Sequence, residues 1–181
     1  MKLKSLKDLF EREVLELYRA KRDSQRMLSM IQRAASSRDL SIQLDQEMSR
    51  ASKHIRWLET LIGTHGIADS RPSRSVARLL ADCLDLSQDE PATPALRDAA
   101  LIALCQHLKH DLIAGIGCTC AWARLLGDEQ AVDVLQHCAR EERESDRQLC
   151  AIADSINRHA LTDQADGQYE PSMEDTVMYF G

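Results

Sequence analysis

Apolar side chains recur at alternating steps of three and four along four long segments of the chain, a spacing typical of α-helices packed in a bundle. We expect these helices at residues 5–35, 39–64, 95–127 and 128–159. The third segment is the centre of the pattern, because it runs for about 33 residues without a proline and would form a rod of roughly 50 Å. A shorter amphipathic helix is expected at residues 73–86, inside the long connection between the second and third segments.

Helix-end signals agree with these boundaries. Ser5 with Asp8 three residues later approximates a capping box at the first helix. Gly66 and Gly127 follow the second and third helices, where glycine accepts the left-handed conformation that closes a helix. The sequence therefore predicts one helical domain over residues 1–161, followed by a polar tail at 162–181 that is flexible or docked along the bundle.

The apolar seam of each long helix is interrupted near its middle by an ionisable side chain. The seam of the second helix, for example, consists of Leu40, Leu44, Glu47, Ala51, His54, Leu58 and Leu61. The interruptions and their ionisable neighbours are Lys21, Arg50, His54, Lys109, His110, Glu142 and Asp146. In antiparallel helices packed side by side, these groups would fall in roughly one layer.

Two interpretations compete for this layer. A single seam histidine is usually a satisfied core residue, and a single seam lysine usually extends its ammonium to water. Four helices with the same interruption at similar depth instead favour a shared site. A di-metal centre needs about four carboxylates and two histidine nitrogens, whereas the cations here repel a metal and can neutralise Glu142 and Asp146 directly. We therefore predict an ion-pair network.

Charge and composition exclude several functions. The net charge is −6 and no basic block stands out, so nucleic acid is not an expected partner. No run of eighteen apolar residues predicts a membrane span. Asp8 and Glu11 interrupt the N-terminus, which is therefore not a signal peptide, and we expect a cytoplasmic protein.

The chain has six cysteines and no CxxC pair. They are Cys83, Cys105, Cys118, Cys120, Cys138 and Cys150. Most occupy apolar helical positions, which favours reduced core thiols in a cytosolic protein. A thiol-based redox or copper-binding bundle is the alternative.

Several stretches of the chain resemble the YciE/YciF-type bacterial ferritin-like family, which is associated with stress response. The matching stretches are MKLKSLKDLFEREVLELYRA, HIRWLE, LRDAALIALCQHLKHDLIAGIGCTCAWARLLG and VLQHCAREERESDRQL, and the likeness covers roughly residues 1–160. The resemblance implies a ferritin-like four-helix bundle with a fifth short helix, a homodimer and a di-metal centre.

Carried over by position, the resemblance implies metal-site glutamates where this chain has Lys21, Arg50 and Lys109. The glutamate and aspartate of the last long helix are kept, as Glu142 and Asp146. The family's other polar positions fall on His54 and His110, and a tyrosine position of the third long helix is Asp111. At each of the three positions Lys21, Arg50 and Lys109, a cationic residue stands where the resemblance implies a glutamate.

We therefore predict an all-α, ferritin-like bundle with a degenerate di-metal centre, a non-catalytic stress-associated role and no bound cofactor. The first alternative is a di-iron or di-manganese oxidase or peroxide-handling protein that uses Glu142, Asp146, His54 and His110. The second is the thiol-based bundle. A homodimer is expected, and a further protein partner is left open.

Overall fold

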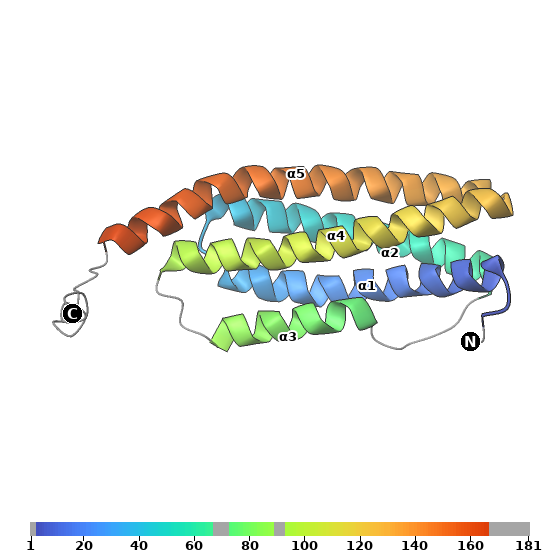
Figure 1. Cartoon of the computed structure of the whole chain (residues 1–181), viewed down its shortest axis with the longest axis horizontal. Helices are drawn as coiled ribbons and strands as arrows, with labels where there is room; N and C mark the ends of the chain where they lie inside the picture. Colours follow the sequence, from blue (N-terminus) through green and yellow to red (C-terminus); the bar gives the residue numbers. More distant parts are fainter. Residues whose placement is uncertain (1–2, 67–72, 89–92, 167–181) are drawn as a thin grey trace, which may run out of the picture.

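The computed structural model describes residues 3–66, 73–88 and 93–166, which contain five α-helices and no strand. The helices are α1 (Leu6–Ala34), α2 (Arg38–His65), α3 (Arg74–Gln88), α4 (Pro94–Leu126) and α5 (Glu129–Asp166). Figure 1 shows four long helices lying lengthwise beside one another, with the shorter α3 alongside α1. None of the described helices is both long and apolar enough to cross a membrane.

The long helices form a closed ring of neighbours. α1 packs on α2 and α4, and α5 packs on α2 and α4, so each helix touches two others across the shared core. α3 packs on α1 and α4, outside the ring. Two hairpins of long helices, joined by a long crossover that carries a short helix, are the ferritin-like connectivity that the sequence predicts.

The helix ends follow the predicted signals. Asp8 N donates to Ser5 Oγ at 3.1 Å and Ser5 N donates to Asp8 Oδ2 at 3.0 Å, which completes the capping box. Gly66 and Gly127 have φ values of 67° and 71°, in the left-handed region that favours glycine. α4 begins one residue earlier than predicted, because Pro94 is accepted in the first turn of a helix.

The last helix is longer than the sequence pattern indicates. α5 continues to Asp166, so the predicted boundary at residue 161 falls inside the helix. No proline or glycine stands between residues 128 and 166 to end it, and loss of apolar periodicity alone does not stop a helix. The remainder of the predicted tail, residues 167–181, lies outside the described residues.

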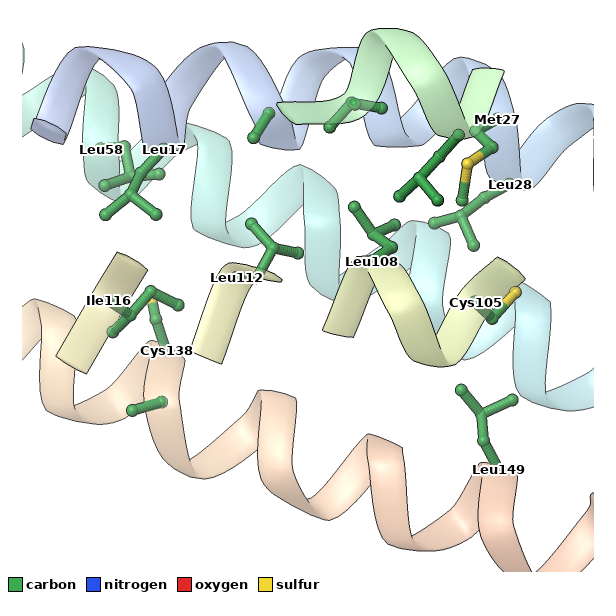
Figure 2. Close-up of a cluster of buried hydrophobic side chains, with 14 of the residues drawn as sticks. Leu17, Met27, Leu28, Leu58, Cys105, Leu108, Leu112, Ile116, Cys138 and Leu149 are labelled. Carbon is green, nitrogen blue, oxygen red and sulfur yellow. The ribbon is translucent and has the colours of Figure 1, made fainter. Parts of the chain in front are cut away.

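The predicted seams form the core. Phe10, Leu44, Ile102 and Leu135, one from each long helix, are each at most 1% exposed. Figure 2 shows side chains of the four long helices converging, with Leu17 beside Leu58 and Ile116 beside Cys138. The ionisable residues of the seams lie inside this apolar packing.

Candidate functional site

Five ionisable side chains are buried at the middle of the bundle. The exposed fractions of the whole residues are 3% for Lys21, 2% for Glu47, 0% for His54, 2% for Lys109 and 1% for Glu142. α1, α4 and α5 each contribute one of them, and α2 contributes two. We call this group the buried charge layer.

The charges in the layer alternate. Lys21 Nζ donates to Glu142 Oε1, and Lys109 Nζ donates to Glu142 Oε2 at 2.9 Å. Lys109 Nζ also donates to Glu47 Oε2. Glu142 is therefore held between two ammonium groups, and Lys109 between two carboxylates.

The second oxygen of Glu47 is also satisfied. Arg50 approaches Glu47 Oε1 with Nε at 2.9 Å and Nη2 at 2.5 Å. Ser145 Oγ donates to the same oxygen, and Gln43 Nε2 donates to Ser145 Oγ at 3.4 Å. Both buried carboxylates thus have charged or polar donors on each of their oxygens, as burial of a carboxylate requires.

His54 connects the layer to the surface between α2 and α5. Its Nε2 lies 2.8 Å from Glu141 Oε2, and Glu141 Oε1 accepts a bond of 2.5 Å from Lys53 Nζ. Its Nδ1 lies 3.0 Å from Glu142 Oε1, at an angle outside hydrogen-bond geometry. The ring stacks on Trp57 with 5.6 Å between centroids.

Burial and charge act in opposite directions on these groups. Burial alone would raise the pKa of Glu142, but the charges of Lys21 and Lys109 outweigh it and hold that pKa well below 4.5. Burial lowers the pKa of Lys109 to about 8, although the charge of Glu142 opposes this change. At neutral pH the layer therefore holds ionised Glu142 beside an ammonium group.

Apolar side chains enclose the layer. Leu17, Leu58, Ile116 and Cys138 lie close together in the core (Figure 2). They surround a small cavity that Lys21 and His54 also line. These neighbours keep water away from the charges, and a lower local dielectric makes each charge contact stronger and each unpaired charge more costly.

The structure brings together Lys21, His54, Lys109 and Glu142, four of the predicted site residues. Arg50 lies at the edge of the layer, bound to Glu47.

The other two predicted members, His110 and Asp146, do not join the layer. They face each other at the outside of the α4–α5 pair, with His110 Nε2 3.5 Å from Asp146 Oδ1 and the His110 side chain 71% exposed. Each follows an inward-facing residue directly, Lys109 or Ser145, and one residue turns a helix by about 100°. This part of the predicted layer is therefore not formed.

Glu47 is the member that the sequence interpretation missed. It stands in the apolar seam of α2 between Leu44 and Ala51, so the signal was present in the same pattern that singled out Lys109. The resemblance placed the glutamate position of this helix at Arg50, which lies one turn later and outside the seam, whereas Glu47 is the residue that faces inward. Arg50 contacts the layer through Glu47.

The donor set does not fit a di-metal centre. Such centres in ferritin-like bundles use one glutamate on each of two helices and a Glu-x-x-His pair on each of the other two. Here the single positions carry Lys21 and Lys109, and Glu47 and Glu142 are followed three residues later by Arg50 and Ser145. Among the residues that the structure describes, no three His, Cys, Asp or Glu side chains are placed to hold one metal ion.

The ring of four long helices and the helix in the crossover define a ferritin-like fold. The chain belongs to the family described as Domain of unknown function (DUF892), whose sequence model matches residues 5–162. Among curated proteins, YciF of Escherichia coli (strain K12) is 25% identical over 163 residues, covering 88% of this chain and 98% of YciF.

Solved structures show the same fold. The crystal structure of the E. coli stress protein YciF matches with a TM-score of 0.80 at 23% identity, over 86% of this chain and 99% of that one. YcfI from Rhodopseudomonas palustris matches with a TM-score of 0.75 at 25% identity, over 82% of this chain and 94% of that one. A two-domain protein from Anabaena variabilis, with DJ-1/ThiJ/PfpI-like and ferritin-like domains, matches at 0.60 and 14% identity, over 93% of this chain and 40% of that one.

Proposed function

We propose that this chain is a non-catalytic ferritin-like protein in which lysine side chains replace the metal of the bundle centre. The observation that carries the proposal is the position of Lys21 and Lys109, which both donate to the buried carboxylate of Glu142. A metal centre neutralises inward carboxylates with a bound cation. Here two ammonium groups supply that charge from within the chain, so the carboxylates remain paired without an exchangeable ion.

The energy of buried ion pairs supports the retention of this network in a bundle that no longer binds metal. A buried ion pair is roughly neutral for stability when compared with apolar residues of the same shape, but removing one partner is costly because the other charge stays buried and unpaired. Once Lys21 and Lys109 paired with Glu142 and Glu47, loss of any one member would destabilise the bundle.

We infer a structural role in stress physiology, performed in the cytoplasm by a homodimer, with any further protein partner left open. Membership of the DUF892 family and the likeness to a protein named as a stress protein support this role. Light scattering coupled to size-exclusion chromatography tests the dimer. A single monomeric peak across a tenfold concentration range would overturn that part of the proposal.

Metal titration of matched variants tests the proposed function. Fe(II) and Mn(II) are added anaerobically to the wild type, to K21E/K109E, and to K21M/K109M. The first variant restores two carboxylates to the layer beside Glu47, Glu142 and His54. K21M/K109M removes the same positive charges without adding carboxylate ligands, so it shows the effect of losing the two ammonium groups alone.

We expect saturable metal binding only in K21E/K109E. Arg50→His added to that variant should strengthen binding, because it supplies a second nitrogen three residues after Glu47. Tight binding by the wild type, lost in Glu142→Ala together with oxygen or peroxide turnover, would overturn the proposal in favour of a di-metal enzyme.

A further inference from the structure

The most exposed residues of α1 form a basic surface. All five exposed residues of this helix are cationic, namely Lys7, Arg12, Arg22, Arg26 and Arg33. At 100° per residue the four arginines fall within an arc of roughly 80°, and they extend over about 32 Å of helix. We call Arg12, Arg22, Arg26 and Arg33 the arginine ridge.

Two acidic side chains of α1, those of Glu16 and Asp23, lie on the flank of the helix towards α3. Glu16 and Asp23 accept hydrogen bonds from Ser73, at the start of α3, at 2.8 Å and 2.6 Å. On the opposite flank, Tyr18 donates to Glu59 of α2 at 3.2 Å. The ridge therefore lies between α2 and α3, with no acid of α1 exposed beside it.

No ridge arginine forms an ion pair with a residue in the described ranges 3–66, 73–88 and 93–166. Arg12, Arg26 and Arg33 also belong to a series of arginines at positions 12, 19, 26 and 33, at intervals of seven, and Arg22 stands outside that series. Arg19 is the covered member, 7% exposed and 3.4 Å from Glu16. The four ridge arginines, which have no ion-pair partner among the described residues, form a positive surface that attracts an anion.

The side chains of the ridge favour phosphate as that anion. Guanidinium groups bind phosphate oxygens in a bidentate manner, and they do so better than ammonium groups. Successive ridge arginines rise by about 15, 6 and 10 Å, comparable with the screening length of about 10 Å at 0.1 M salt. Their fields therefore overlap along the helix and suit a chain of charges better than one isolated ion.

The surroundings of the ridge argue against base recognition. Single-stranded nucleic acid is usually held by free aromatic faces on which bases stack. Tyr18, at the edge of the ridge, is half-buried, is bonded to Glu59, and has the Arg22 guanidinium 5.7 Å from its ring centre. The uneven spacing of the arginines also suits a flexible chain more than a rigid duplex.

We propose that the arginine ridge binds inorganic polyphosphate, a flexible polyanion with a phosphate on every unit and no bases. This site lies on the outer surface of α1 and is independent of the buried charge layer, so it stands whether or not the centre of the bundle binds metal.

The test compares two variants with equal loss of charge. R12Q/R22Q/R26Q/R33Q removes the ridge, and R124Q/R143Q/R147Q/R158Q removes four exposed arginines from α4 and α5. Binding of polyphosphate of defined chain length is measured by calorimetry at several NaCl concentrations, after circular dichroism and melting curves show that both variants fold. A poly-dT oligonucleotide and poly-glutamate serve as competing probes.

We expect wild-type binding whose log K falls with log[salt] at a slope of about −3, the value for four contacts to a single-stranded polyanion. The ridge variant should lose at least about tenfold in affinity, while the control variant changes less than about twofold. Absence of binding by the wild type at low salt, or equal weakening in both variants, would overturn the proposal. Equal or tighter binding of poly-dT or poly-glutamate at the ridge would overturn its assignment to polyphosphate.

Discussion

Lys109 Nζ lies 2.9 Å from Glu142 Oε2, and both residues are at most 2% exposed. A cation of α4 thus faces an anion of α5 inside the core, at the level where ferritin-like bundles hold metal. Since Lys21 of α1 shares the same carboxylate, Glu142 joins three helices through charge contacts. Loss of the Glu142 charge should therefore have a large effect on the stability of the fold.

Replacing Glu142 with glutamine should strongly destabilise the fold. The amide keeps the shape of the side chain but removes the negative charge, which leaves the buried ammonium groups of Lys21 and Lys109 short of a counter-charge. We expect the free energy of unfolding to fall by about 3–5 kcal/mol, as when one partner of a buried pair is lost. Urea denaturation followed by circular dichroism measures this change.

Glu144→Gln is the matched control for that variant. Glu144 lies two residues later on α5 and pairs with Arg147 at 2.5 Å, but its side chain is 50% exposed. An exposed pair contributes about 0–1 kcal/mol, so the control should unfold almost as the wild type does. Similar decreases in the free energy of unfolding in both variants would show that the buried charge of Glu142 contributes no more to stability than the exposed charge of Glu144.

Acid should destabilise the wild type through the same carboxylate. The pKa of Glu142 is well below 4.5 in the folded chain, because Lys21 and Lys109 outweigh the effect of burial. Its contribution to stability is therefore fully present above pH 4.5, the ordinary value, and is lost as the pH falls towards the lower folded value.

The free energy of unfolding measured between pH 7 and pH 3 should thus fall more steeply in the wild type than in Glu142→Gln, which has no carboxyl at this position to protonate. Parallel pH profiles for the two proteins would contradict the assignment of an ionised Glu142 to the layer.

Much of the fold could be predicted because the apolar seams obey helical periodicity throughout. Phe10, Val14 and Leu17 lead to Lys21 on one face of α1, and all four are buried as the spacing indicates. The end of α5 could not be placed, since the residues after 159 lose apolar periodicity and yet contain no residue that breaks a helix before Gly167.

The candidate site was less predictable. A sequence pattern indicates how far along a helix a side chain lies better than it indicates the direction in which that side chain points from the helix axis. Lys109 and His110 are adjacent in sequence, yet one is 2% exposed and the other has a side chain that is 71% exposed. The pairing of Glu47 with Lys109 depends on how α2 and α4 face each other across the core, which no single-helix pattern contains. The sequence pattern did not predict the arginine ridge, because its members are seven or more residues apart for most of its length and form no basic run.

The six thiols should divide into two reactive and four protected groups. Cys118 and Cys150 are exposed, whereas Cys83, Cys105, Cys120 and Cys138 are buried. Burial raises the pKa of Cys105 and of Cys138 to about 12, which suppresses the reactive thiolate. We expect two thiols to react rapidly with a disulfide reagent in the native protein, and six after unfolding.

The variant C118S/C150S should show no rapid phase while retaining the wild-type melting temperature. Rapid reaction of the buried thiols in this variant, or stoichiometric uptake of Cu(I) by the native protein, would instead support the thiol-based alternative.

Elemental analysis of the purified protein is the sharpest test of whether lysine side chains replace the metal in this bundle. The wild type is expressed in medium supplemented with iron and manganese, purified without chelator, and compared with K21E/K109E prepared in parallel. We expect far less than one iron or manganese per chain in the wild type and a clear gain in the variant. A near-stoichiometric content of either metal in the wild type would contradict the claim that Lys21 and Lys109 occupy the position of the metal.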